Sequence, residues 1–496
     1  VDDPGDIDVA VGLRIPLGRK TPKPVAVDFS RSPVVKTEPR SRTTTTIPTT
    51  IIPSPADTDA NRDRADKVAT TSTPAEPKTT PDIDWRVVNG IMSRLAELGF
   101  ENIRVGVIGT STLYAEFENS HFNANEVDGL GLVLGTISQM LSEDFDRLVV
   151  RLKNSDLPVI EIASPVAPLR EYFLATFEDQ LPEAFLAAEN NVQVRFSPYK
   201  RPADLELLPE KRNSQFGRST LIIHPGIRNT IGTEVGVFDY RLSARLDLVT
   251  RLWQGASLNL RADIPVAWSD EFADGGLFQG DGHNDPVIDR VFFAQNVRLF
   301  SSLTTQFSGG LFLEDMYGAM NTTIVQSPGG SHRLRFRGGI FEDSDSKEQS
   351  ELFVGSYRYY LAPWDIFFEA SAGQFLSEDT GYQLELKRFF GDTAVSAVYT
   401  DTEERTIAFR ISFPLGGKKD FRPGIFQVRG SERFDYQISS VLTEKGGRNP
   451  IVFGVGVNPQ TIVDPERTIY NSDRLNPRYI MEHLPRMRAS YLRFRD

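Results

Sequence analysis

The chain of 496 residues contains no cysteine and no long apolar segment. The absence of cysteine excludes disulfides, a thiolate metal site and a cysteine lipid anchor. No stretch approaches the roughly 18 apolar residues that a membrane helix needs. An excess of positive charge is also absent, because 67 acidic residues outnumber 55 lysines and arginines and the formal net charge is −12. This balance argues against a nucleic-acid partner held through phosphate contacts. If the chain enters a membrane, it must do so as a closed β-barrel, the other structure that satisfies backbone groups in lipid.

Motifs for catalysis and metal binding are missing as well. The five histidines lack zinc spacing, and there is no phosphate-binding loop, metalloprotease motif or serine nucleophile elbow. Ser331-His332 has no visible third member of a triad. We therefore predict no enzyme activity, no catalytic residue, no metal site and no cofactor.

Two segments still require a choice between a site and a structural role. Gly129-Leu-Gly-Leu-Val-Leu-Gly135 has the wrong spacing for a dinucleotide loop, which favours close helix packing. The acidic loop 270–289 could bind calcium through its carboxylates, but a solvated surface loop is the preferred interpretation. Its acidic residues are Asp270, Glu271, Asp274, Asp281, Asp285 and Asp289.

Alternation of polar and apolar residues dominates the second half of the chain. From Ser257 to Ile264, Leu258 and Leu260 alternate with Asn259 and Arg261. A strand has a side-chain period of two, so such a segment has one apolar and one charged face. The pattern recurs at residues 333–340, 382–389 and 406–413. It predicts a large antiparallel sheet that separates two different environments.

We predict a mainly β protein whose residues 199–457 form a transmembrane antiparallel β-barrel of about 12–14 strands, each long enough to cross a bilayer. A soluble β-sandwich would show the same alternation, with the apolar groups inside, so periodicity alone does not exclude it. Strand number, strand length and the placement of aromatic residues favour the barrel. Whether its lumen is open stays undecided.

The charged faces of these strands are the candidate lumen lining. Mixed charges along a wet passage suit a polar substrate such as a glycan, although pairing among these charges in a filled lumen is an equal alternative. The predicted lumen-lining residues are Arg261, Asp263, Arg333, Arg335, Arg337, Glu385, Lys387 and Arg410. Aromatic residues near strand ends suit the lipid headgroup level. The predicted aromatic girdle consists of Trp253, Trp268, Tyr359, Tyr360, Trp364, Phe389, Phe390 and Phe421.

The rest of the chain divides by composition. Residues 1–18 alternate like a strand, and Ile15-Pro-Leu-Gly matches the ending Phe413-Pro-Leu-Gly, so we interpret them as an orphan strand, the last of a missing first barrel. The chain is then processed or truncated at Val1. Residues 19–83 are rich in proline and threonine and predict a disordered linker. Residues 84–198 predict a small α+β domain, with helices near residues 84–99, 123–141 and 168–177 and hairpins at 103–118 and 147–162. Residues 458–496 are a basic, irregular tail.

The sequence resembles the YjbH/GfcD-like outer-membrane proteins of exopolysaccharide and capsule clusters. The likeness is carried by residues 128–153, which include Gly-Leu-Gly-Leu-Val-Leu-Gly and Phe-Asp-Arg-Leu-Val-Val-Arg-Leu-Lys, and by Ile411-Ser-Phe-Pro-Leu-Gly and Phe389-Phe-Gly-Asp. The resemblance implies two barrels joined through a periplasmic α+β domain, in the outer membrane of a Gram-negative bacterium. It also implies a non-enzymatic role in export or surface organisation of polysaccharide. The implied partners are outer-membrane lipids, polysaccharide and polysaccharide-export lipoproteins.

Two other functions remain open. An α+β domain before a barrel is also similar to outer-membrane assembly or two-partner secretion proteins with a POTRA-like domain. Val428-Arg-Gly-Ser431 matches three residues of that family's motif, with serine in place of its aromatic residue. A general porin is the third possibility.

Overall fold

The structure, a computed structural model, describes residues 83–176, 180–233, 236–278, 284–313, 315–442, 455–459 and 461–496. All of them belong to one compact unit. The expected orphan strand at 1–18 and, apart from Ile83, the expected linker at 19–83 lie outside the described residues. Within these ranges, no helix has the length and apolar character to cross a membrane.

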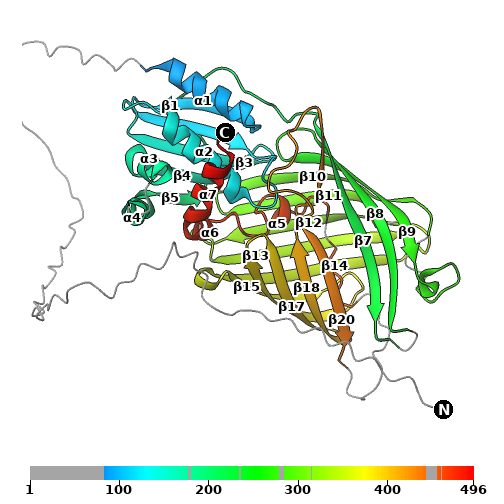
Figure 1. The fold of residues 1–496 in the computed structure, drawn as a ribbon. Coiled ribbons are helices and arrows are strands. Elements are labelled where there is room, and N and C mark those ends of the chain that lie inside the picture. Colours follow the sequence, from blue (N-terminus) through cyan, green and yellow to red (C-terminus); the bar gives the residue numbers. More distant parts are fainter. Residues whose placement is uncertain are drawn as a thin grey trace, which may run out of the picture. The chain divides into compact units, whose positions relative to one another are not determined.

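The first part of the fold is a mixed six-stranded sheet with helices (Figure 1). Its strand order is β5-β4-β3-β2-β1-β6, and only β2 and β3 run parallel. The connection between these two strands is helix α2, so they form a βαβ unit. The strands are β1 (Glu101–Ile108), β2 (Thr112–Glu118), β3 (Arg147–Asn154), β4 (Leu157–Pro165), β5 (Gln193–Phe196) and β6 (Leu205–Leu207). The helices are α1 (Trp85–Glu97), α2 (Glu126–Met140), α3 (Val166–Leu174) and α4 (Leu181–Asn191).

Helix starts and ends in this part follow local signals. Asp84 caps α1 by accepting a hydrogen bond from the Arg86 N–H, and Asn125 caps α2 in the same way. Gly99 takes φ = +93° just past α1, a conformation that glycine adopts without strain. The three predicted helices and two predicted hairpins are confirmed. Helix α4 and strands β5 and β6 were not predicted.

The C-terminal segment is folded, which corrects the prediction of an irregular tail. It forms α5 (Pro465–Thr468), α6 (Pro477–Glu482) and α7 (Leu484–Phe494), and α7 packs on α2. Gly131 and Gly135 of α2 face Met487 and Tyr491 of α7, both fully buried. The glycine-rich segment therefore serves helix packing, as predicted. The tail was hard to place from its sequence because its partner helix lies more than 340 residues away.

Substituting Gly131 with alanine is expected to destabilise the fold by about 1–3 kcal/mol through overpacking. A Cβ at this position would lie 2.2 Å from the Met487 carbonyl oxygen and 2.5 Å from its Cα, so the α7 backbone would have to move. The matched control is Gly90→Ala in α1, where the nearest atom is Met140 Cε at 3.7 Å. That change should stabilise by about 0.5–1 kcal/mol, as alanine does in helices. Chemical denaturation measures both, and equal effects would contradict the packing argument.

The second part of the fold is a fourteen-stranded sheet, coloured green to orange in Figure 1. Neighbouring strands from β7 to β18 follow one another in the chain and pair antiparallel. The strand number lies within the predicted range. The strands are β7 (Ser219–Ile231), β8 (Phe238–Arg251), β9 (Ala256–Trp268), β10 (Val287–Phe300), β11 (Leu303–Leu313), β12 (Met316–Gln326), β13 (His332–Asp343), β14 (Gln349–Leu361), β15 (Ile366–Gln374), β16 (Thr380–Phe390), β17 (Thr393–Asp401), β18 (Arg405–Phe413), β19 (Phe426–Gly430) and β20 (Phe434–Val441).

The two end strands of this sheet are consecutive in the chain. Strand β19 pairs parallel with β7, β20 pairs antiparallel with β18, and Ser431–Arg433 join them. Among the described residues β19 and β20 are not paired with each other, so the sheet is not closed into a barrel by hydrogen bonds. The structure thus shows a mainly β protein with one large sheet, a coarser result than the predicted barrel.

Candidate functional site

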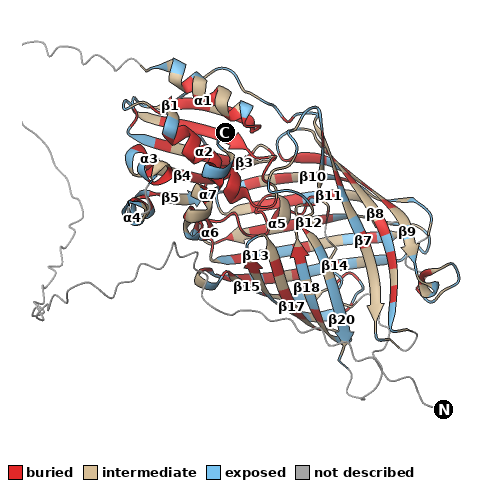
Figure 2. Ribbon diagram, in the orientation of Figure 1, coloured by how far each residue is buried: buried red, intermediate tan, exposed pale blue. Residues whose placement is uncertain are grey.

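The large sheet buries its charged face and exposes its apolar face, the reverse of a water-soluble sheet. On β13, Leu334 and Phe336 are 43% and 46% exposed, whereas the alternating Arg333, Arg335 and Arg337 are buried. Figure 2 shows this alternation of buried and exposed positions along the strands. A water-soluble sandwich would bury the leucine and the phenylalanine instead. The sheet therefore encloses charge and presents apolar side chains outward.

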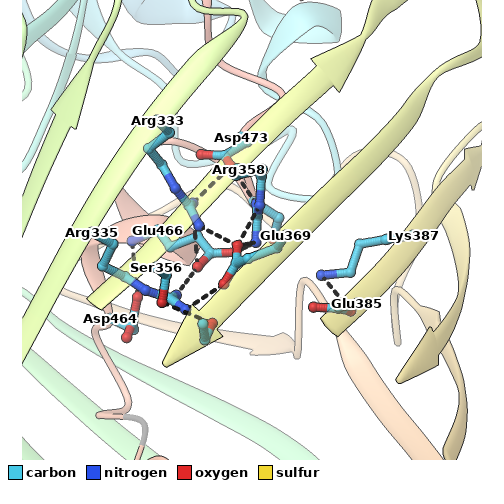
Figure 3. Close-up of polar contacts among 12 residues, drawn as sticks. Arg333, Arg335, Ser356, Arg358, Glu369, Glu385, Lys387, Asp464, Glu466 and Asp473 are labelled. Atoms are coloured by element: carbon cyan, nitrogen blue, oxygen red, sulfur yellow. Dashed lines mark hydrogen bonds and ion pairs between the residues drawn. The ribbon is translucent and has the colours of Figure 1, made fainter. Parts of the chain in front are cut away.

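The densest group of enclosed charge lies on β13, β14 and β15 (Figure 3). Arg333 pairs in register with Arg358, and Arg358 pairs with Glu369, so three strands place these side chains in one row. Like charges directly opposite each other are destabilising on their own. Glu369 compensates them, with Oε2 2.6 Å from Arg333 Nη2 and Oε1 2.6 Å from Arg335 Nη2. We call Arg333, Arg335, Arg337 and Arg358 the arginine cluster.

The remaining carboxylates come from the C-terminal segment. Glu466 bridges the cluster, with one oxygen paired with Arg333 and Arg335 and the other 2.8 Å from Arg358 Nη2. Asp473 contacts Arg333 Nη1 at 2.7 Å and also pairs with Arg358. Asp464 pairs with Arg337. Three acidic residues of a segment with basic overall composition thus neutralise the arginine cluster.

Local structure holds this segment against the sheet. Asp464 caps the short helix α5 by accepting from the Glu466 N–H at 2.9 Å. Gln306 Nε2 donates to the Val463 carbonyl at 2.7 Å, and the Thr304 and Tyr470 hydroxyls lie 2.7 Å apart. The segment is therefore fixed on both sides of Glu466.

The other predicted lumen residues fall into two separate groups. Arg261 pairs with Asp247 at 2.5 Å, and Asp263 pairs with Arg245 at 2.9 Å, all on β8 and β9. Glu385 and Lys387 on β16 pair at 3.1 Å, and Arg410 on β18 lies 3.6 Å from Glu385. All eight predicted residues are buried or half-buried. Sequence reasoning missed Arg358, Glu369 and the three tail acids. Whether any of these residues line a passage stays a prediction.

A polar cavity of about 500 Å³ joins two of these groups. Arg335, Arg358, Glu369 and Glu466 belong to its lining. The lining also includes amide, hydroxyl and charged side chains, among them Gln383, Glu385, Lys387, Thr400, Arg410 and Gln437. Such groups suit a ligand with hydroxyl or carboxylate groups.

The predicted aromatic girdle needs a correction. Tyr360 and Phe389 are buried, at 3% and 2% exposed, so they cannot belong to an outward ring. Tyr360 donates to Asp365, and Phe389 packs under the guanidinium groups of Arg433 and Arg474. These partners belong to the turns and the tail, which strand periodicity does not reveal. The remaining members are exposed or half-exposed: Trp253, Trp268, Tyr359, Trp364, Phe390 and Phe421.

In the part of the chain that the structure describes, no three His, Asp or Glu side chains gather as a metal site. Asp281 of the acidic loop lies outside that part. His332 Nδ1 contacts the Tyr357 hydroxyl at 2.8 Å. His224 Nε2 lies 3.1 Å from Asp247.

One acidic group near the C-terminal segment titrates unusually. Glu126, the first residue of α2, is 6% exposed. Burial raises the pKa of Glu126 to about 8, and the nearby charge of Glu118 acts in the same direction. The Asn119 amide, which donates to Glu126 Oε2 at 2.7 Å, only partly opposes this rise. The carboxyl group is thus predominantly protonated at neutral pH.

The variant Glu126→Gln is expected to gain stability relative to the wild type as pH rises from about 5 to 8. The folded pKa lies above the ordinary value of 4.5, so the folded wild type binds more protons and loses stability through this window. Through this group the free energy of unfolding of the wild type falls by at most about 1.4 kcal/mol per pH unit. Glutamine does not titrate, so the variant lacks this dependence. Denaturant titrations at several pH values measure the difference. The exposed Glu97→Gln is the control, and a pH-independent difference for Glu126→Gln would refute the assignment.

The sequence matches a known protein family. A family model described as exopolysaccharide biosynthesis protein YbjH matches residues 40–426. The match covers the six-stranded sheet and the large sheet up to the start of β19. No curated protein and no solved structure matches the chain.

Proposed function

The chain belongs to the YjbH family of exopolysaccharide biosynthesis proteins, and from this premise we propose that it is an outer-membrane β-barrel protein that takes part in exopolysaccharide export or surface organisation. Its α+β domain lies in the periplasm. Its role is non-enzymatic, and its partners are outer-membrane lipids, polysaccharide and polysaccharide-export lipoproteins. The family supports the link to exopolysaccharide; the membrane location and the export role are our inference.

The exposed apolar face of the large sheet supports the proposed location in a membrane. Large apolar side chains are exposed on many strands of this sheet. Examples are Phe307, Leu334, Phe353, Phe368, Leu386 and Phe409. Exposing large apolar side chains to water is unfavourable, so a sheet that encloses arginine and exposes phenylalanine is suited to lipid outside. Strands β7 to β18 are 9–14 residues long. A tilted transmembrane strand needs about 9–11 residues.

The connection between the end strands supports a barrel. Because only three residues link β19 to β20, the two ends of the sheet must lie close together. An open sheet of fourteen strands would otherwise leave two distant edges exposed to aggregation. The sheet is therefore well suited to closure around its charged face.

Deletion of the gene, together with fractionation of the protein, tests this function. We expect the protein in the outer-membrane fraction, extracted only by detergent, and altered or absent surface polysaccharide with normal amounts of other barrel proteins. Normal polysaccharide beside depleted porins would favour a role in barrel assembly. Glycan-independent solute flux through reconstituted liposomes, with normal surface polysaccharide, would favour a general porin.

The assembly alternative gains little from the Val-Arg-Gly residues. Val428, Arg429 and Gly430 form the end of strand β19, where they pair with β7, and Val428 is 40% exposed. Ser431, which replaces the aromatic residue of that motif, is buried in the link to β20. These residues have a structural role at the sheet end.

A further inference from the structure

The arginine cluster depends on the C-terminal segment for its charge balance. Among the described residues four carboxylates pair with it, and of these only Glu369 belongs to the large sheet. The other three are Asp464, Glu466 and Asp473. Without them, the sheet would hold four arginines against one glutamate. The sheet's own contribution to this cluster is thus cationic.

Glu466 occupies the cluster as a bound carboxylate would. Its two oxygens contact three guanidinium groups, and the side chain of Arg335 approaches Glu466 and Glu369 through different nitrogens. Planar guanidinium groups bind carboxylates through such paired, charge-assisted hydrogen bonds. The same geometry would accept the carboxylate of a ligand.

The cavity beside Glu466 supplies room for the rest of such a ligand. Its volume of about 500 Å³ lies within the usual range of small-molecule sites, about 300–1,000 Å³. Arg335 and Arg358 face it from the cluster side, and Lys387 and Arg410 face it from β16 and β18. Gln383 and Gln437 add amide groups that can bind sugar hydroxyls. With Arg228, five cationic side chains line the cavity beside three carboxylates, Glu369, Glu385 and Glu466, and this surplus of cations favours an acidic over a neutral saccharide.

We propose that Arg333, Arg335 and Arg358, together with the adjoining cavity, form a binding site for the carboxylates of an acidic saccharide, and that Glu466 and Asp473 occupy this site as an internal ligand. An acidic glycan competes with these two side chains for the same guanidinium groups. The C-terminal segment therefore keeps the site closed until a carboxylate-bearing chain replaces it. This inference rests on the proposed polysaccharide function.

Calorimetric titration with trigalacturonate as the acidic probe and maltotriose as the neutral probe tests the site. The full chain is purified with or without detergent, as its solubility requires. We expect Glu466→Gln/Asp473→Asn to bind trigalacturonate at least about tenfold more tightly than the wild type, with no gain for maltotriose. Glu482→Gln changes an exposed carboxylate of the same segment, whose one ion pair in the described part of the chain is with Arg478, and this variant should match the wild type.

The double variant leaves buried arginines uncompensated and can fail to fold. In that case Glu466→Asp, which keeps the charge and shortens the side chain by one methylene, is expected to show a smaller gain for trigalacturonate. A folded variant that binds neither probe, or that binds both equally, overturns the proposal. Such a result would assign the tail acids a purely structural role.

The titration and the deletion experiment can fail independently. Tight trigalacturonate binding with unaltered surface polysaccharide would overturn the proposed function and retain the site. Altered polysaccharide with no gain in binding by a folded variant would retain the function and overturn the site.

Discussion

Replacing Glu369 with glutamine is expected to destabilise the folded chain by about 3–5 kcal/mol. Glutamine keeps the size of the side chain but removes the sheet's own negative charge from Arg333, Arg335 and Arg358, all buried. Breaking a buried ion pair on one side is costly because the remaining charge stays out of water. Here three guanidinium groups lose a partner at once, and Glu466 and Asp473 must satisfy them alone.

Unfolding by urea, followed through the fluorescence of the four tryptophans, measures this loss. Glu351→Gln on β14 is the control, since Glu351 is exposed and has no ion pair among the described residues. Its effect should stay within about 0.5 kcal/mol. If the two variants unfold alike, the arginine cluster does not depend on Glu369.

Replacing Tyr491 with alanine is expected to lower the free energy of unfolding by about 3–5 kcal/mol, the usual loss for a large aromatic residue in a core. Tyr491 is fully buried, its ring packs edge-on against Phe173 at 5.6 Å, and its hydroxyl donates to Gln139 at 2.7 Å. The neighbouring Leu492→Ala is the control on the same helix, because Leu492 is 38% exposed. A comparable loss for Leu492→Ala would show that α7 is sensitive as a whole rather than at its contact with α2.

A double-mutant cycle sharpens this test. A Cβ on Gly135 would lie 2.3 Å from the Tyr491 ring, so Gly135→Ala should be destabilising in the wild type. In the Tyr491→Ala background the ring is gone, and the same change should be tolerated. The coupling between neighbours of this kind is about 0.5–3 kcal/mol. Additive effects would show that the two residues do not share this space.

Local and periodic features of the fold could be predicted from the sequence. The Asp84 cap and the apolar positions Val88, Ile91 and Leu95 define α1, because capping and helical spacing are local properties. The alternation at residues 333–340 placed the arginines on the face opposite Leu334 and Phe336, as the structure shows. Strand periodicity determines which side chains share a face, but not which environment that face meets.

The partners of those side chains could not be predicted in the same way. Glu466 reaches Arg335 across 131 positions, and nothing in the local pattern of either segment marks the pair. The excess of arginine in residues 458–496 also concealed the acidic residues that matter most. Tyr360 illustrates the same limit, since its burial depends on Phe367 and Asp365 after the adjoining turn.

The position of the three tail acids after the large sheet in the chain order has a consequence for biogenesis. Asp464, Glu466 and Asp473 emerge from the ribosome after every strand that carries the arginine cluster. Nascent chains that stop before Asp464 therefore carry an arginine cluster that only Glu369, of its four carboxylates, compensates. Such chains are expected to be less stable than chains that contain the three tail acids, and therefore more open to proteolysis.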